Sequence, residues 1–161
     1  MVAALSLVYR CYLRRSLIPP NSLCLRLREG IEGTDRLTTF GAFEGSWLLA
    51  TVGVIHDGEE GLPVDAFGVQ SGDGRAEFTN LASRQFATIG PLFAAVHKWC
   101  LARGITTGYA QVSPRDVRLY KRLGFRSVGE VVDAAGDSVQ VMVTTDAEAD
   151  LGRLRRRIKA A

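Results

Sequence analysis

The sequence predicts a mixed α/β sheet flanked by helices, and three observations indicate this fold class. Segments with strand patterns alternate with helical segments in the middle of the chain. A pair of strands with hairpin character lies on each side of that region. The composition, 47% hydrophobic and 23% charged over 161 residues, is typical of one globular domain with an apolar core. We therefore expect a single domain over residues 1–161.

The first half of the chain predicts one helix and three strands. Apolar residues recur at helical spacing over residues 1–20, and the pair Pro19-Pro20 ends this N-terminal helix. The segments 36–44 and 47–56 are apolar, alternate weakly and are separated by Gly45-Ser46, which predicts a hairpin. A further strand is expected at Ala76–Ala82.

The second half predicts two helices between strands. Pro91 suits the first position of a helix, and Gly104 suits its end. A strand at Thr106–Val112 leads to Pro114, which opens a helix over Arg115–Leu123. The remaining elements are strands at Phe125–Val132 and Ser138–Thr145, a turn around Ala135-Gly136-Asp137, and a basic helix or tail over 146–161.

Charge and cysteine content exclude several classes of protein. The net charge is only +3, which does not imply nucleic-acid binding, but it conceals charged blocks. Residues 29–83 carry ten acidic and two basic side chains, whereas residues 84–126 carry one acidic and eight basic ones. Three unpatterned cysteines predict neither a disulfide framework nor a zinc site, so we expect a cytoplasmic protein. No apolar run approaches the ~20 residues of a transmembrane helix.

The sharpest motif is Tyr120-Lys121-Arg122-Leu123-Gly124-Phe125. It resembles the late Tyr-x-x-Leu-Gly-Phe motif of the GNAT acyltransferase superfamily, and the resemblance covers about residues 34–145. The resemblance implies a mostly antiparallel sheet with a splayed central strand pair, and it implies that Tyr120 protonates the departing thiolate. A phenol of pKa about 10 and a thiol of about 8.5 are close enough for this transfer. The alternative is a tyrosine that only packs in the core.

The segment Ser83–Pro91 stands where the superfamily has its pyrophosphate loop, (Gln/Arg)-x-x-Gly-x-(Gly/Ala). Gln85 and Gly90 match the first and last positions, but Thr88 replaces the central glycine. Glycine lets backbone amides approach a phosphate, and the following helix would add the positive end of its dipole. The departure at Thr88 argues against tight binding of coenzyme A, and the alternative is a plain strand–helix connection.

Three short motifs indicate a narrower resemblance. They are Gly61-Leu62-Pro63 before a strand, Glu77 followed by Leu81-Ala82 along that strand, and Ser113-Pro114-Arg115 at the late helix. They are similar to motifs of the N-acyl amino acid synthases, relatives of the autoinducer synthases, which take long acyl chains from acyl carrier protein. This resemblance implies an acyl-phosphopantetheine donor, on acyl carrier protein or coenzyme A, lying along the strand that contains Leu81.

Glu77 is the predicted general base. A carboxylate in a central strand is costly unless it is paired or used, and partial burial makes it a better base toward an amino acid's ammonium group. The alternative is an ion pair with an arginine such as Arg36 or Arg84. Alternation along the strand divides its side chains into two faces, Glu77, Thr79 and Leu81 against Phe78 and Ala82.

A basic stripe is predicted on the late helix, where Arg115, Arg118 and Arg122 are spaced i, i+3 and i+7 with Lys121 beside them. An acidic carrier protein or a diphosphate would be steered to such a stripe, and the alternative is an ordinary solvated face. The donor-binding residues expected from the motifs and the stripe are Leu81, Ala82, Ser83, Arg84, Gln85, Thr88, Gly90, Arg115 and Arg118.

The sequence therefore predicts an N-acyltransferase that moves a long acyl chain from acyl carrier protein to an amino acid's α-amino group. An apolar acyl channel is expected, with Phe40, Phe43, Trp47 and Phe67 as candidates to line it. No metal is expected, because His56 and His97 lack other ligands nearby in the sequence. Two alternatives stay open. One is an acetyl-CoA-dependent acetyltransferase of a small amine, and the other is a non-catalytic module that docks an acidic partner.

Overall fold

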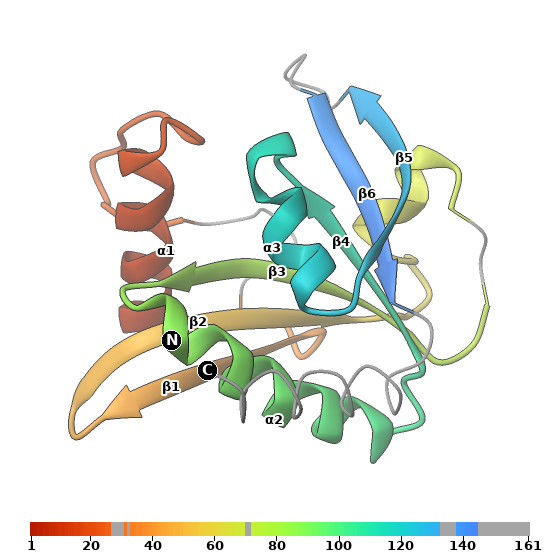
Figure 1. The fold of residues 1–161 in the computed structure, drawn as a ribbon, viewed down its shortest axis with the longest axis horizontal. Helices are drawn as coiled ribbons and strands as arrows, with labels where there is room; N and C mark the ends of the chain where they lie inside the picture. The colour runs from red at the N-terminus through yellow and green to blue at the C-terminus, as the bar shows by residue number, and fades with distance from the viewer. Residues whose placement is uncertain (27–30, 32, 70–71, 133–137, 145–161) are drawn as a thin grey trace.

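The protein is built on one six-stranded sheet with the strand order β1-β2-β3-β4-β6-β5 (Figure 1). The computed structural model describes residues 1–26, 31, 33–69, 72–132 and 138–144. Neighbouring strands are antiparallel except β3 and β4, which are parallel. The mixed, mostly antiparallel sheet confirms the expected fold class. The strands are β1 (Leu37–Glu44), β2 (Trp47–His56), β3 (Arg75–Ser83), β4 (Thr107–Val112), β5 (Arg126–Val132) and β6 (Ser138–Thr144).

Helices cover the two faces of this sheet. Helices α2 and α3 bury their apolar side chains with Phe78 and Met142 in the main core, whereas α1 packs on β2 and β3 around Ala82. A third apolar cluster lies under η1 and contains Ile55 and Val64. The helical elements are α1 (Val2–Arg14), η1 (Pro63–Phe67), η2 (Phe86–Thr88), α2 (Ile89–Leu101), η3 (Pro114–Asp116) and α3 (Val117–Arg122), where η marks a short 3₁₀ helix.

Three predicted helix boundaries are wrong. Helix α1 ends at Arg14, before the Pro19-Pro20 pair that was expected to end it. Helix α2 begins at Ile89, so Pro91 is its third residue, not its first. This placement is tolerated because the first turn of a helix has no internal acceptors for its N–H groups. The helix expected after Pro114 is a 3₁₀ turn followed by the short α3, so the spacing argument for a continuous basic stripe does not hold at Arg115.

Strand β3 reverses its facing pattern at Asn80. This residue has a positive φ of 51° where the pairing with β2 shifts register, which marks a bulge. Leu81 therefore packs on the core that contains Phe78, while Ala82 packs against α1. The prediction that Leu81 shares a face with Glu77 is wrong, because the bulge adds one residue to the alternation. Asparagine tolerates this backbone conformation better than most other residues.

The parallel pair β3–β4 diverges along its length. The two strands are paired from Arg75 opposite Thr107 to Phe78 opposite Ala110, and the pairing stops there. Residues 79–83 keep β2 as a neighbour but leave β4. This is the splayed central pair that the resemblance implied. The predicted turn at Ala135-Gly136-Asp137 and the basic segment 146–161 lie outside the described residues.

Candidate active site

A cleft of about 860 Å³ lies where β3 and β4 diverge. It is lined by the diverging ends of both strands, by the last turns of α1 and the segment after it, and by η3 and α3. Its apolar lining includes Leu17, Ile18, Phe86, Ile89, Leu119 and Val139. None of the aromatic residues expected to line an acyl channel contributes to this cleft. Phe40 packs against Trp99, and Phe43 and Trp47 are exposed.

Glu77 lies at the inner end of the cleft, where the strands begin to part. The residue is only 1% exposed, and its carboxylate accepts two hydrogen bonds from fixed donors. The Val64 amide donates to Oε2 at 2.8 Å, and Gln111 Nε2 donates to Oε1 at 3.0 Å. Both contacts stabilise a charged carboxylate inside the protein and fix its orientation. Arg36, one of the arginines considered as a partner, forms an ion pair with Glu60 instead.

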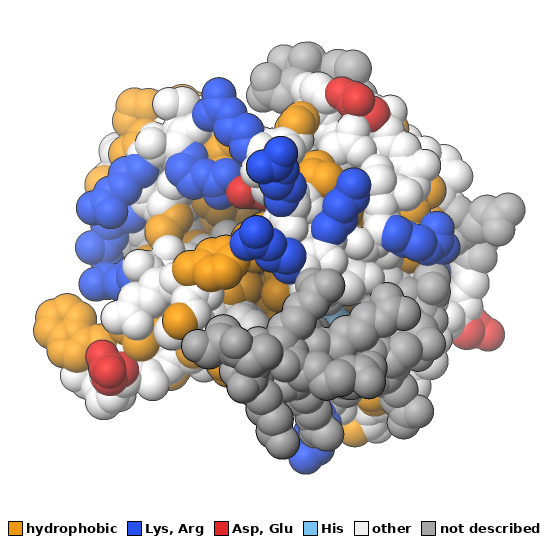
Figure 2. All heavy atoms as spheres, in the orientation of Figure 1, with side chains coloured by type: hydrophobic (Ala, Val, Ile, Leu, Met, Phe, Trp, Pro, Cys, Tyr) orange, Lys and Arg blue, Asp and Glu red, His pale blue; other side chains and the backbone are white. Residues whose placement is uncertain are grey.

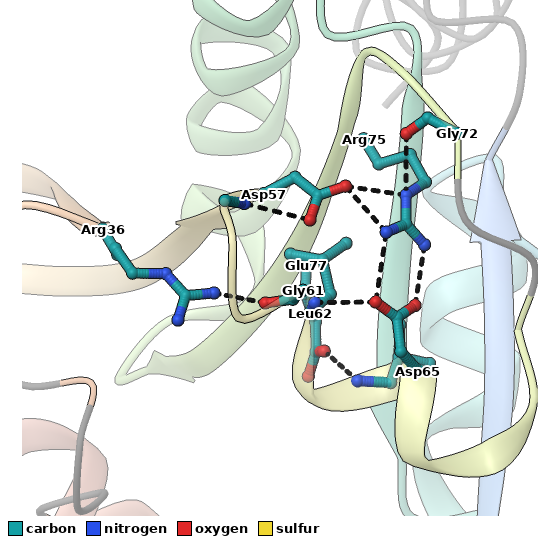
Figure 3. Close-up of polar contacts among 10 residues, drawn as sticks. Arg36, Asp57, Gly61, Leu62, Asp65, Gly72, Arg75 and Glu77 are labelled. Carbon is teal, nitrogen blue, oxygen red and sulfur yellow. Dashed lines mark hydrogen bonds and ion pairs between the residues drawn. The ribbon is translucent and has the colours of Figure 1, made fainter.

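The η1 turn that supplies the Val64 amide is held by a buried arginine (Figure 3). The Arg75 side chain is 5% exposed and forms ion pairs with Asp57 and Asp65, each at 2.7 Å. Asp65 also accepts the Leu62 amide at 2.8 Å, and its hydrogen bond with Arg75 lowers its pKa. The Arg75 cluster therefore pins η1 against β3, and η1 in turn pins the Glu77 carboxylate.

Tyr120 approaches the same cleft from the other face of the sheet. It lies within α3, is 7% exposed and packs edge-on against Phe93 and Phe125 in the main core. Burial raises the pKa of Tyr120 well above its ordinary value, and the nearby charge of Glu77 adds to this rise. The phenol is therefore protonated at neutral pH, which is the state a proton donor requires.

The divergence of β3 and β4 is what lets these two residues share a site. Glu77 belongs to the face covered by η1, since it bonds to Val64, whereas Tyr120 belongs to the face covered by α2. A continuous sheet would separate side chains on its opposite faces. The cleft passes between the strands, so both residues line it.

The loop from β3 to α2 is folded on itself. Ser83 Oγ accepts the Gln85 amide at 3.0 Å and lies 2.9 Å from Thr88 Oγ1. The Thr88 hydroxyl donates to the Gln85 carbonyl at 2.7 Å, and the Thr88 amide points to that same carbonyl. The Arg84 amide donates to the Leu49 carbonyl. Three amides of the expected pyrophosphate loop are thus already used.

Basic side chains surround the mouth of the cleft. Figure 2 shows Lys and Arg side chains over α1 and over the α3 region, on either side of a hollow with apolar side chains. The cleft-lining arginines at this mouth, Arg14, Arg15 and Arg115, are exposed, and we refer to them as the basic rim. Arg15 bridges α1 and η3 through an ion pair with Asp116 at 2.6 Å.

The structure brings together only part of the predicted site. The predicted residues that line the cleft are Glu77, Leu81, Ala82, Ser83, Arg115 and Tyr120. The predicted residues that do not line it are Arg84, Gln85, Thr88, Gly90 and Arg118. Sequence reasoning missed Gln111 and the cleft-lining arginines of the N-terminal segment, among them Arg26. A polar residue in the otherwise apolar strand β4 was a signal for Gln111, but its use required the register with β3.

Among the described residues, no cluster of three or more His, Cys, Asp or Glu side chains could hold a metal ion. His97 instead packs against Phe78 and Phe93, as expected for a core histidine. Within the same part of the chain, no helix has the length and apolar character needed to cross a membrane.

The mostly antiparallel sheet, with a cleft where its central strands diverge, is the fold that the GNAT resemblance implied. The family model of the N-acyl amino acid synthase FeeM matches residues 3–144 of this chain. The chain therefore belongs to the FeeM N-acyl amino acid synthase family, and the protein is an acyltransferase. No curated protein matches the sequence.

Solved structures support the same fold. FeeM, an N-acyl amino acid synthase from uncultured soil microbes, is 22% identical over 96% of this chain and 92% of FeeM, with a TM-score of 0.73. BjaI, a CoA-dependent acyl-homoserine lactone synthase solved with SAM and isopentyl-CoA, is 15% identical over 98% of this chain and 81% of its own, with a TM-score of 0.76. A putative N-acetyltransferase from Lactobacillus plantarum is 17% identical over 88% of both chains, with a TM-score of 0.63.

Proposed function

We propose that this acyltransferase moves a long acyl chain from a phosphopantetheine thioester to the α-amino group of an amino acid. The observation that carries the proposal is that Glu77 and Tyr120, from opposite faces of the sheet, line one cleft at the point where β3 leaves β4. A base and an acid on opposite sides of a bound thioester are what direct amine attack requires.

In the proposed reaction Glu77 acts as the general base and Tyr120 as the general acid. Glu77 takes a proton from the acceptor's ammonium group, and the free amine attacks the thioester carbonyl carbon. The new C–N bond forms as the C–S bond breaks, and Tyr120 donates its proton to the departing sulfur. The nitrogen releases its remaining extra proton to water, which leaves a neutral amide and a free thiol. The pantetheine arm lies along residues 79–83 of β3, where the edge released by β4 offers backbone groups to its amides.

Acyl carrier protein is the proposed donor. The amides of Gln85 and Thr88 are used within the β3–α2 loop, and the Arg84 amide bonds to Leu49 in β2, so the loop offers few donors to the diphosphate of coenzyme A. The basic rim, in contrast, presents exposed arginines on both sides of the cleft. Such a surface suits an acidic protein that delivers its pantetheine arm into the cleft. One domain over residues 1–161 and a cytoplasmic location complete the proposal.

A donor panel tests this function. The protein is incubated with pooled amino acids and, in turn, with long-chain acyl carrier protein, long-chain acyl-CoA and acetyl-CoA, and the products are identified by mass spectrometry. We expect long-chain N-acyl amino acids, formed fastest from acyl carrier protein. Products from acetyl-CoA alone would overturn the carrier-protein donor in favour of an acetyltransferase. Binding of acyl carrier protein without turnover of any donor would favour a non-catalytic module.

A further inference from the structure

Arg26 is placed inside the cleft and not on its rim. Its backbone amide donates to the Leu5 carbonyl on α1 at 3.3 Å, which ties this position to the helix, and its half-buried side chain lines the cleft together with Glu77. The rim arginines Arg14 and Arg115 are exposed, and Arg15 is paired with Asp116. Arg26 is therefore less exposed than these three arginines.

The guanidinium of Arg26 holds an unused donor in the protein interior. Its Nε atom is buried and has no hydrogen-bond partner among the described residues. A buried donor of a charged group that lacks an acceptor is costly, and few are retained without a use. Arg36 Nε shares this property, but Arg36 is paired with Glu60 and lies outside the cleft.

The group that complements such a donor is a carboxylate. The Nε–H and an adjacent Nη–H of arginine form a planar fork that matches the two oxygens of a carboxylate. An α-amino acid carries its carboxylate and its ammonium group on one carbon atom. A single ligand could therefore present the ammonium group to Glu77 and the carboxylate to Arg26 within this cleft.

We infer that Arg26 binds the carboxylate of the acceptor and so restricts the enzyme to amino acids among amines. This inference rests on the proposed function, because it assigns the acceptor half of that reaction. Arg26 would hold the acceptor, while Glu77 takes its proton and the basic rim receives the donor.

The test compares three acceptors that share one side chain: the amino acid, its carboxamide, and the amine that lacks the acid group. Wild-type kcat/KM is expected to favour the amino acid by about 10- to 100-fold, the worth of a charged hydrogen-bonded pair. Arg26→Gln should raise the KM for the amino acid, abolish the preference and leave the KM for the donor unchanged. Arg26→Lys should restore part of the preference. Arg10→Gln, on the α1 surface outside the cleft, is the matched control.

A second readout does not depend on turnover. Calorimetry measures binding of the same three compounds, with and without a non-reactive thioether analogue of the donor, and thermal unfolding verifies that each variant is folded. Binding that requires the carboxylate and is lost in Arg26→Gln supports the inference, even if no product forms and the proposed function fails. A preference that persists in Arg26→Gln, or equal or absent binding of all three compounds by the wild type, overturns it.

Discussion

The two halves of β3 have opposite properties within one strand. Residues Ala76–Phe78 have β2 on one side and β4 on the other, and Arg75 before them is paired with β4 and forms the buried ion-paired cluster. Residues Thr79–Ser83 keep β2 but leave β4, so one edge of their backbone faces the cleft. The bulge at Asn80 lies close to the division.

This difference shows how one strand can both hold a side chain in a fixed position and border an open cleft. The paired half fixes Glu77, because β4 supplies Gln111 and η1 supplies the Val64 amide. The open half has an edge that β4 does not cover, and this half of the strand lines the cleft. The proposed base and the proposed path of the donor thus belong to adjacent residues of one strand.

The largest expected effect comes from breaking the paired half. Arg75→Met leaves Asp57 and Asp65 without their partner, and Arg75 is 6% exposed. Removing one side of a buried ion-paired cluster costs about 3–5 kcal/mol. The free energy of unfolding, measured in urea, should fall by that amount. Arg10→Gln, which loses only contacts to Ser6 on the same helix, should change it little. If Arg75→Met lowers the free energy of unfolding by less than about 1 kcal/mol, the range of a surface ion pair, the Arg75 cluster does not hold η1 against β3.

Removing the proposed base should have the next largest effect. Glu77→Gln should lower kcat/KM about 1,000-fold at neutral pH, within the range of general base catalysis. Stability should change less, because Gln111 can rotate its amide to present its oxygen to the new side chain. An unchanged kcat/KM in a folded Glu77→Gln variant would assign the base elsewhere.

Removing the proposed acid should have a smaller effect on rate. Tyr120→Phe keeps the packing against Phe93 and Phe125 but loses the proton donor, so we expect kcat to fall about 100-fold with little change in unfolding. The raised pKa of Tyr120 keeps the hydroxyl protonated through mildly alkaline pH. Wild-type activity should therefore not decline below pH 10 through this group. An unchanged kcat in Tyr120→Phe would exclude it as the acid.

The smallest expected effect is on stability, at the bulge at Asn80, close to the division between the two halves of β3. Asn80 has a positive φ, which glycine adopts freely and alanine resists. Asn80→Ala should be about 1–2 kcal/mol less stable than Asn80→Gly, because both lose the asparagine side chain and differ by one methyl group, so the backbone conformation accounts for most of the difference. Equal unfolding midpoints for the two variants would show that the positive φ at residue 80 does not contribute to stability at the bulge.

Local patterns were enough to predict the elements of the sheet and the two residues of the proposed chemistry. Each strand was expected within one or two residues of its observed bounds, because hairpin spacing and apolar runs are local signals. Glu77 and Tyr120 came from the resemblance to acyltransferase motifs; both line the same cleft, and their catalytic roles stay predictions. The reversal at Asn80 escaped prediction because asparagine occurs in many strands without a bulge.

The acceptor side of the cleft could not be predicted, because it depends on contacts between distant parts of the chain. Gln111 meets Glu77 only through the parallel register of β3 and β4. Arg26 reaches the cleft only because α1 packs on β3 and carries the following segment with it. The sequence shows a basic N-terminal block, but not the surface that the block borders.

The contrast between the halves of β3 can be measured directly by hydrogen exchange. The protein is compared alone and with acyl carrier protein that bears a non-reactive long-chain thioether in place of the thioester. Exchange should slow in peptides that cover residues 79–83 and 111–112, since the bound arm pairs with the released edge. Peptides from residues 76–78 should not change, because their backbone is already paired on both sides. No slowing at residues 79–83, or equal slowing along all of β3, would contradict the account.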